Sequence, residues 1–384
     1  MEKTCSLKLE DAYQSPRRIP VELSKQPYEI IIGKGALHRI GEELLKAGIK
    51  KGVKILVVTN NDVAVLYSDI FLNSLIASGY DPNLLIIQAG EEQKTPESIA
   101  LIHDAAYSAQ LERGSLMIAL GGGVVGDMTA FAAATWLRGI SVVQVPTTLL
   151  AMVDASIGGK TGVNHPMGKN LIGSFHQPRL VLIDINTLQT LPEREFRSGM
   201  AEIIKYGLIA DKKFYNTVKS NFIKLIRLEN IDQIESIIYQ CCKHKINFFI
   251  DDEFDYNKRM ILNFGHTIGH AIESYYNYKN ISHGEAVYYG MIASAFISHK
   301  HGLLIESDFN HIYDFIFNIP KVGLNNLDSE KVYKYIKYDK KRMGNKNYFI
   351  LLNDIGKADI VENVTSDDIK EAITFIANYE YSCN

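Results

Sequence analysis

The feature that most constrains this fold is a rhythm of short apolar strands and helical stretches that begins at Tyr28 and stops after Ile185. Strand-like runs such as VKILVVTN, SLMIALGGG and LVLIDI are rich in β-branched residues, and helical stretches separate them. This alternation predicts a mostly parallel α/β sheet. After about Thr187, segments such as SGMAEIIKYGLIA and GEAVYYGMIASAFISHKHG have helical periodicity with few strand signals. The second half is therefore predicted to be a helical domain.

We expect two domains, because 384 residues exceed the length at which a single hydrophobic core usually stops growing. Residues 25–186 are predicted to form the α/β domain and residues 187–384 the helical domain. The exception is a small hairpin at 348–361, followed by a helix that begins near Thr365 and Ser366. Residues 1–24, which contain Pro16 and Pro20, are predicted to be a loose leader. A ligand site is expected in the cleft between the two halves.

Composition excludes several classes of protein. The formal net charge is -3 and charged residues make up 22%, which gives no general electrostatic reason to bind nucleic acid or an anionic membrane. No apolar run approaches the roughly 20 residues that span a bilayer, and the acids in the first turns are unlike a targeting peptide. We expect a soluble cytoplasmic protein whose four cysteines, Cys5, Cys241, Cys242 and Cys383, are free thiols.

The glycine-rich stretch GGGVVGD, residues 121–127, contains G-x-G-x-x-G as Gly121, Gly123 and Gly126, directly after the strand SLMIAL. Glycines there let backbone amides approach a pyrophosphate at the start of the next helix. However, no acidic residue lies between Asp127 and Asp154 to hold a ribose about 20 residues further on. This motif alone leaves both dinucleotide binding and an ordinary tight turn open.

The polar stretch VDASIGGKTGVNHPMGKN, residues 153–170, lies within the predicted α/β half, before its last strand-like run LVLIDI. A solvated surface loop is one interpretation, and a site for a phosphate or carboxylate is the other, because glycines beside lysines and amides allow close approach of an anion. Sequence spacing cannot show whether its polar residues meet the other candidate cations in one cleft. The residues concerned are Asp154, Lys160, Asn164, Lys169 and Asn170, with Lys245, Arg259, Lys340 and Lys341 further along.

Two histidines four residues apart, His266 and His270 in ILNFGHTIGHAIE, stack on one face of a helix. That spacing suits a metal, a proton transfer or a packing seam. With Glu202 and His283 they offer enough ligands for a catalytic zinc site, which needs three protein ligands and an open position. The stretch lacks the glutamate of H-E-x-x-H, which disfavours peptide hydrolysis.

Taken in order, the motifs resemble the 3-dehydroquinate synthase family of the sugar phosphate cyclases. The resemblance rests on GGGVVGD, RGISVVQVPTTLLAMVDASIGGKTGVNHPMGKN, GSFHQP, LPEREFRSGMAEIIKYGLI, RMILNFGHTIGHAIE, HGEAVYYGM and DKK, and it runs from about Tyr28 to the last helix. It implies a Rossmann-like α/β N-terminal domain that binds NAD, an all-α C-terminal domain, one catalytic Zn2+ for which Co2+ can substitute, and a homodimer.

The resemblance also implies a role for each site residue. The zinc ligands would be Glu202, His266 and His283. Asp154 and Lys205 would contact substrate hydroxyls, and Lys245 and Arg259 the substrate carboxylate. The phosphate group would be held by Lys160, Asn170, Asn263, His270 and Lys340 or Lys341, with Lys169 in the same site and Arg138 reaching across the dimer. NAD would lie against Gly121, Gly122, Gly123, Gly126, Asp127, Thr147, Thr148, Lys94 and Glu91. Asn60 departs from the pattern, because relatives often place Asp there for the ribose.

The activity implied is conversion of 3-deoxy-D-arabino-heptulosonate 7-phosphate to 3-dehydroquinate in the shikimate route. It would proceed by transient oxidation with NAD, phosphate β-elimination, re-reduction, ring opening and an intramolecular aldol step. Alternatives are a sister cyclase such as 2-deoxy-scyllo-inosose synthase or 2-epi-5-epi-valiolone synthase, an aminodehydroquinate synthase, a metal-dependent polyol dehydrogenase and a non-catalytic NAD-binding protein. Arg259 with Lys245 argues against the two named cyclases, whose substrates lack the carboxylate.

Overall fold

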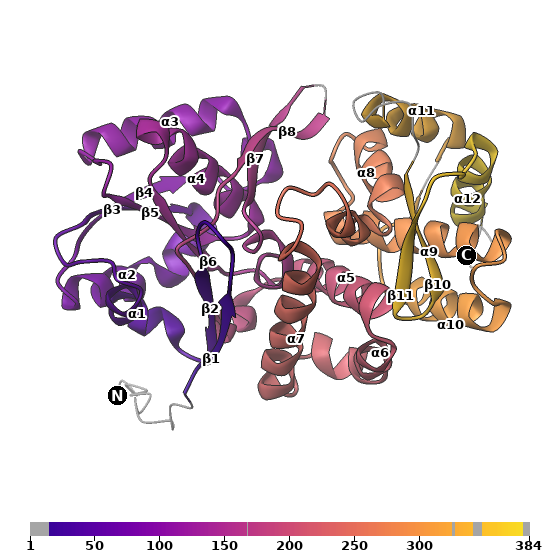
Figure 1. The fold of residues 1–384 in the computed structure, drawn as a ribbon, viewed down its shortest axis with the longest axis horizontal. Coiled ribbons are helices and arrows are strands. Elements are labelled where there is room, and N and C mark those ends of the chain that lie inside the picture. The colour runs from indigo at the N-terminus through magenta and orange to yellow at the C-terminus, as the bar shows by residue number, and fades with distance from the viewer. Residues whose placement is uncertain (1–14, 167, 325–326, 341–347, 379–384) are drawn as a thin grey trace, which may run out of the picture.

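A parallel sheet and a group of helices lie side by side in the computed structural model, which describes residues 15–378 apart from 167, 325–326 and 341–347 (Figure 1). Seven strands of the described chain form the main sheet. Their spatial order is β1 (Arg17–Val21), β2 (Tyr28–Gly33), β9 (Leu180–Asp184), β6 (Ser141–Pro146), β5 (Leu116–Gly121), β3 (Lys54–Asn60) and β4 (Asp81–Ile87). All neighbours are parallel except β1 and β2. The predicted α/β domain is confirmed.

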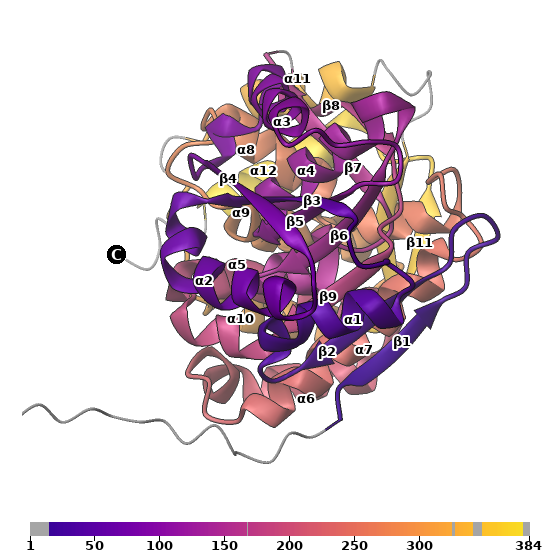
Figure 2. The same ribbon diagram turned by 90° about the vertical axis from the view of Figure 1, so that its left-hand side faces the viewer.

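The sheet is buried on both faces because alternate side chains of each strand point to opposite sides. Ile55 and Val57 pack with α1 (Ile40–Lys46) and α2 (Asn61–Ala77). Leu56 and Val58 pack with α3 (Pro96–Ser108) and α4 (Gly123–Thr135). At the β2 end of the sheet, Ile30 belongs instead to the core of the helical part. The two parts therefore share a continuous apolar contact, and the helical part lies behind the sheet when seen from the sheet end (Figure 2).

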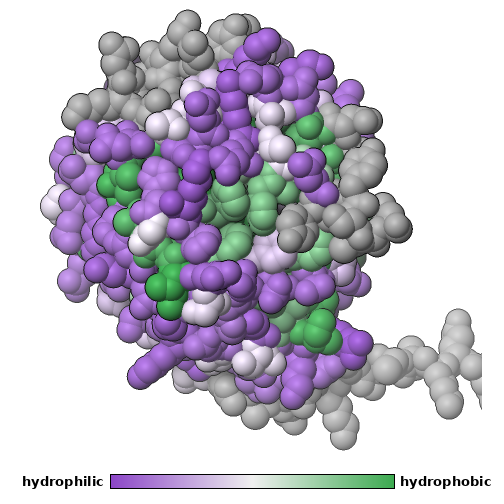
Figure 3. Space-filling model, turned by 90° about the vertical axis from the view of Figure 1, so that its right-hand side faces the viewer, coloured by the Kyte–Doolittle hydropathy of each residue, from purple (hydrophilic) through white to green (hydrophobic). Residues whose placement is uncertain are grey.

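The second part is helical, as predicted. Its elements are α5 (Glu193–Ala210), α6 (Lys212–Ile226), α7 (Ile231–Phe249), η6 (Lys258–Asn263), α8 (His266–Tyr275), α9 (His283–Lys300), α10 (Glu306–Phe317), α11 (Ser329–Lys340) and α12 (Ser366–Asn378). The hairpin of β10 (Phe349–Asp354) and β11 (Lys357–Val361) is also confirmed. The outer face of this part is largely hydrophilic, with hydrophobic patches between the polar side chains (Figure 3). No helix among the described residues is long and apolar enough to cross a membrane.

Two predictions need correction. Arg17–Val21, expected to belong to a loose leader, forms β1 on the free edge of β2, where Pro20 is tolerated because an edge strand needs fewer ladder donors. The stretch expected as a possible surface loop contains an antiparallel hairpin, β7 (Lys160–His165) and β8 (Gly168–Phe175). Residues 1–14, and Cys5 with them, lie outside the described chain, and so does Cys383. The domain boundary near residue 187 stays a prediction.

The backbones of α8 and α9 come into direct contact at glycine residues. A Cβ at Gly290 would overlap the carbonyl oxygen of Gly265, and Gly265 itself has φ of 77°. Gly265 immediately precedes His266, and Gly290 lies two turns after His283. The glycine contact therefore fixes the positions of two candidate ligands relative to each other.

We expect Gly290→Ala to lower the free energy of unfolding by about 1–3 kcal/mol, because the added methyl group forces the two helices apart. Chemical denaturation of purified protein measures this loss. Gly114→Ala is the matched control: its φ is not positive, and a Cβ there would meet nothing within 4 Å among the described residues. Equal stability of the two variants would contradict the close-contact explanation.

Candidate active site

Three potential metal ligands converge from three helices. Glu202 lies in the middle of α5, His266 is the first residue of α8, and His283 is the first residue of α9. One ligand atom from each lies within 4.8 Å of the other two. His266 Nε2 is 3.3 Å from Glu202 Oε1, and His283 Nε2 is 3.8 Å from the same oxygen. The predicted ligand set is therefore assembled.

The carboxylate of Glu202 is fully buried and surrounded by nitrogen atoms. Burial alone would raise its pKa, but Lys205 and His266 hold the pKa well below its usual range. Lys205, three residues along α5 and also buried, forms an ion pair with it. Among the described residues, neither oxygen of Glu202 has a well-formed hydrogen bond.

This environment fits a divalent cation. A buried, ionised carboxylate beside two imidazole nitrogens is a donor set that Zn2+ prefers, and three ligands leave a coordination position open. His266 Nδ1 is 3.1 Å from the carbonyl oxygen of Phe264, which leaves Nε2 facing Glu202. His270 projects from the same helix face, but its ring belongs to a second group with Glu273 and His283.

Asp154 lies next to this cluster, on η4 (Ala151–Ala155), a π-helical turn of the kind often found at functional sites. Lys245 Nζ is 2.7 Å from Asp154 Oδ1, and the hydroxyl of Tyr206 is 3.0 Å from the same oxygen. Burial would raise the pKa of Asp154, but Lys245 and Lys205 lower it, so the group is an anion at neutral pH. The predicted residues Asp154, Lys205 and Lys245 are thus brought together.

Arg259 is buried on η6 and extends toward the same region. Its guanidinium donates to the carbonyl oxygens of Gly158, at 2.7 Å, and Glu253, at 2.5 Å. Burial lowers the pKa of this group, whereas the carboxylates of Asp255 and Asp154 act in the opposite direction. The Gly158 contact joins η6 of the helical part to the segment just before β7.

The β7–β8 hairpin reaches the helical part through two lysines. Lys160 pairs with Asp255, a residue with φ of 65°, and Lys169 Nζ is 2.8 Å from Glu273 Oε1. The Phe175 ring meets Phe254 edge to face, with 5.3 Å between ring centroids. These contacts place the cations of the hairpin at the boundary between the two parts.

The glycine-rich turn lies where the sheet and α4 meet, as predicted. Gly121 ends β5, Gly122 caps α4 without a side-chain hydrogen bond, and a Cβ at Gly126 would lie 2.9 Å from Gln144 Oε1. Small residues there let α4 pack on the sheet and leave the helix amino terminus open to an anion.

Polar residues predicted to bind the cofactor surround this turn. Lys94 Nζ is 2.5 Å from both Asp127 Oδ2 and Asn170 Oδ1. Glu91 accepts a hydrogen bond from Asn164 at 2.9 Å. The backbone N–H of Thr147 donates to Gly121, and Thr148 follows at the end of β6. Gly123 begins α4.

Other predicted residues are not joined to these clusters by the contacts described. Asn60 ends β3 and caps α2, where its Oδ1 accepts from the N–H of Val63 at 2.9 Å. Arg138 is exposed beyond the far end of α4, with φ of 69°. Asn263 is half-buried at the end of η6. The side chain of Lys340 and all of Lys341 lie outside the described residues.

Sequence reasoning missed three residues that contact the site: Tyr206, Asp255 and Glu273. Glu273 carried a signal, because it lies three residues after His270 and therefore on the same helix face. Tyr206 adjoins Lys205, but an aromatic residue in an apolar helix is more typical of a hydrophobic core than of a site. Asp255 carried no signal, since its pairing with Lys160 joins residues 95 positions apart.

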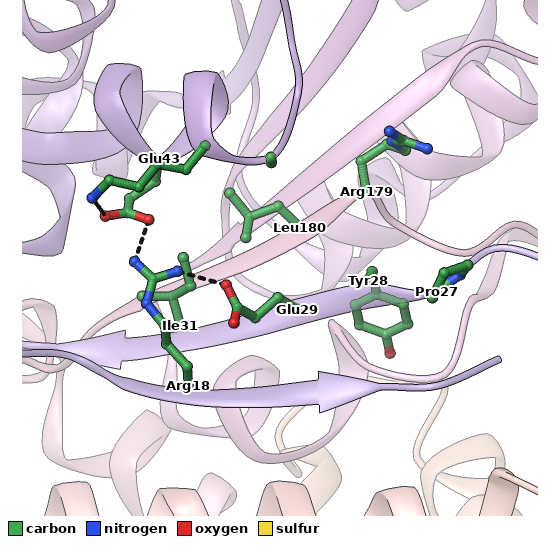
Figure 4. Close-up of a pocket in the computed structure, with 10 residues that line it drawn as sticks. Arg18, Pro27, Tyr28, Glu29, Ile31, Glu43, Arg179 and Leu180 are labelled. Atoms are coloured by element: carbon green, nitrogen blue, oxygen red, sulfur yellow. Dashed lines mark hydrogen bonds and ion pairs between the residues drawn. The ribbon is translucent and has the colours of Figure 1, made fainter.

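A separate surface pocket lies at the amino-terminal ends of β2 and β9, whereas the glycine-rich turn follows the carboxyl end of β5. Arg18 lies there between Glu29 and Glu43, at 2.5 and 2.6 Å, and Lys46 also pairs with Glu43 (Figure 4). The charges that line this pocket therefore largely neutralise one another.

Comparison with protein-family models matches residues 84–198 to the 3-dehydroquinate synthase N-terminal family and residues 199–342 to the 3-dehydroquinate synthase C-terminal family. A 3-dehydroquinate synthase from Prochlorococcus marinus (strain MIT 9313) is 52% identical over 363 residues, which cover 93% of this chain and 97% of the relative. One from Rippkaea orientalis (strain PCC 8801 / RF-1) is 48% identical over 367 residues, 94% of this chain and 99% of the relative.

Solved structures share the fold at lower identity. A 2-epi-5-epi-valiolone synthase from Streptomyces hygroscopicus subsp. jinggangensis 5008, with NAD+ and Zn2+ bound, has a TM-score of 0.83 and 26% identity over 93% of this chain and 99% of that one. A 2-deoxy-scyllo-inosose synthase with carbaglucose-6-phosphate, NAD+ and Co2+ has the same score, identity and coverage. Both family models and relatives about half identical over nearly the whole chain agree: the chain belongs to the 3-dehydroquinate synthase family.

Proposed function

We propose that this protein is a 3-dehydroquinate synthase, which converts 3-deoxy-D-arabino-heptulosonate 7-phosphate to 3-dehydroquinate and phosphate. The observation that carries the proposal is the buried cluster of Glu202, His266 and His283, which lies beside the lysines of the site. The chain that holds this cluster is 52% identical to a 3-dehydroquinate synthase. Sister cyclases are less similar, at 26% identity. The likeness to glycerol dehydrogenase from Schizosaccharomyces pombe, at 16% identity and a TM-score of 0.67, concerns the fold alone.

The proposed cofactors are one Zn2+ and NAD. Glu202, His266 and His283 would hold the metal, and the turn from Gly121 to Gly126, with Lys94 and Asp127 beside it, would hold the dinucleotide. A divalent metal supplies Lewis-acid polarisation of a hydroxyl group, and NAD+ supplies a reversible hydride acceptor. Asn60, being neutral, would give a ribose a weaker hydrogen-bond acceptor than Asp would.

The side chains around Asp154 would orient the hydroxyl groups of the substrate. Asp154 stays ionised between Lys245 and Lys205, so it accepts hydrogen bonds from hydroxyls without taking up a proton at neutral pH. Lys245 and Arg259 would receive the substrate carboxylate, and burial of both strengthens that interaction because the local dielectric is low. Holding a flexible open-chain intermediate in one conformer raises its effective concentration for ring closure.

The phosphate group would bind near the hairpin, through Lys160, Asn170, Asn263 and His270, with Lys169 nearby. Lys340 or Lys341 is the further residue proposed to contact it. In the structure Lys160 already pairs with Asp255. Phosphate binding would therefore exchange one anionic partner of Lys160 for another rather than capture a free cation.

Assembly and location are part of the same proposal. We expect a homodimer in which Arg138, exposed beyond α4, reaches the phosphate site of the partner copy. We also expect a cytoplasmic location, supported by the buried free thiols of Cys241 and Cys242, which suit a reducing compartment.

The direct test is to incubate metal-loaded protein with 3-deoxy-D-arabino-heptulosonate 7-phosphate and NAD+, following phosphate release and absorbance at the NADH wavelength together. We expect phosphate release without accumulation of NADH, because the reduced cofactor is reoxidised within each cycle. Absence of phosphate release would contradict this substrate, and steady growth of NADH would indicate a dehydrogenase.

Lys160→Ala is expected to keep the fold and lower kcat/KM by about 10- to 100-fold, the value of one hydrogen bond to a charged group. Steady-state kinetics measure the loss, and circular dichroism checks the fold. Lys50→Ala, at an exposed lysine in the loop before β3, is the control and should behave as wild type. Unchanged kinetics in Lys160→Ala would remove Lys160 from the phosphate site.

His283→Ala is expected to lose bound zinc, whereas wild type should retain about one zinc per chain. Elemental analysis after gel filtration in metal-free buffer measures both. His38→Ala, which removes an exposed histidine outside the site, should keep the wild-type zinc content. Full zinc in His283→Ala would mean that another side chain, with His270 the nearest candidate, completes the ligand set.

A further inference from the structure

The carboxylate of Glu273 lies between Lys169 and His283, and the proposed reaction assigns it no role. Glu273 is 2% exposed on α8. Its Oε2 lies 3.3 Å from His283 Nδ1, and its Oε1 lies 2.8 Å from Lys169 Nζ. His270 Nε2 is 4.0 Å from Oε2. Glu273 thus contacts His283 at Nδ1, whereas Nε2 of the same ring is the nitrogen near Glu202. Through this contact, the buried carboxylate can influence how His283 binds a metal.

The geometry assigns a tautomer to His283. A neutral imidazole carries one N–H and one lone pair, on different nitrogens. When Nδ1–H donates to Glu273, the lone pair is on Nε2, the nitrogen 3.8 Å from Glu202. His266 has the same arrangement with a different acceptor, because its Nδ1 faces the carbonyl oxygen of Phe264. Each imidazole of the cluster is therefore held by a second acceptor.

The same atoms permit a different interpretation, in which His270, Glu273 and His283 form a second metal site. Two observations disfavour it. Lys169 already occupies one oxygen of Glu273, and its ammonium group would lie next to the incoming cation. His283 would also have to serve two metals, which a neutral imidazole with a single lone pair cannot do.

We propose that Glu273 is a positioning residue, which fixes the tautomer and ring orientation of His283 and is itself held in place by Lys169. The proposal rests on the metal role of Glu202, His266 and His283 under the proposed function. Lys169 comes from the hairpin of the α/β part and Glu273 from the helical part. The two contacts, from Lys169 to Glu273 and from Glu273 to His283, thus connect the boundary between the two parts to the proposed metal site.

The test measures metal binding without substrate, in wild type, Glu273→Ala and Glu273→Gln. Zinc affinity is obtained by competition with a chromophoric chelator, and the ligand field by the visible absorption of the Co2+ form. We expect Glu273→Ala to raise the Kd for Zn2+ about 10- to 100-fold and to change the Co2+ spectrum. Glu273→Gln, which keeps an oxygen acceptor at the same place, should recover part of both.

Glu43→Ala is the matched control, because Glu43 is also a 2% exposed carboxylate paired with two cations (Figure 4). It should lower thermal stability yet leave the Kd and the Co2+ spectrum at wild-type values. This separates positioning of a ligand from a general effect of losing a buried charge.

The contradicting outcomes are distinct. Wild-type affinity and spectrum in both Glu273 variants would overturn the positioning role while leaving the metal site intact. Two zinc ions in wild type, one of them lost in Glu273→Ala, would make Glu273 a ligand instead. A wild-type protein that binds no zinc at all would overturn the metal site itself, and this proposal with it.

Discussion

The structure depends on the burial of one negative charge, the carboxylate of Glu202, in the middle of α5. An isolated carboxylate in such a place costs several kcal/mol of desolvation, which the fold has to offset. Lys205 from the same helix and His266 from α8 provide the offset, and the pKa of Glu202 falls well below its usual range. An arrangement that moved α8 away from α5 would leave Lys205 without the help of His266 in stabilising this buried charge.

Glycines make that arrangement possible, because they let backbones approach where side chains would collide. A Cβ at Gly284 would overlap the backbone of Ser198 on α5, and a Cβ at Gly199 would lie 2.7 Å from the backbone nitrogen of Leu150, just before η4. The contact between Gly265 and Gly290 joins α8 to α9. Residues far apart in sequence are thereby held within the few ångströms that metal ligation requires.

Much of this could be predicted from the sequence, because it depends on local pattern. The strands β2 to β6 and β9, the glycine-rich turn before α4, the hairpin at 348–361 and the helices that carry Glu202 and His283 are readable from periodicity and turn chemistry, whereas β1, β7 and β8 were not predicted. What escaped prediction depends on long-range pairing. The placement of β9 between β2 and β6, the pairing of Asp255 with Lys160 and the pairing of Glu273 with Lys169 involve partners that no local window contains.

Three lysines among the described residues of the site, Lys160, Lys169 and Lys245, are each paired with a carboxylate, and this links ligand binding to the contact between the two parts. Lys160 and Lys169 of the hairpin pair with Asp255 and Glu273 of the helical part, and Asp154 of η4 pairs with Lys245 of α7. A phosphate or carboxylate that entered would replace one of these carboxylates.

The pair of Lys160 and Asp255 is half exposed on the lysine side, and exposed ion pairs contribute little net stability. Exchange of Asp255 for a phosphate therefore costs little, while the pair keeps the Lys160 ammonium group at a defined position. Groups proposed to recognise the substrate therefore also form polar contacts between the helical part and the α/β part, in addition to their shared apolar core. It follows that a ligand bound there would act on the relative position of the two parts through the contacts it displaces.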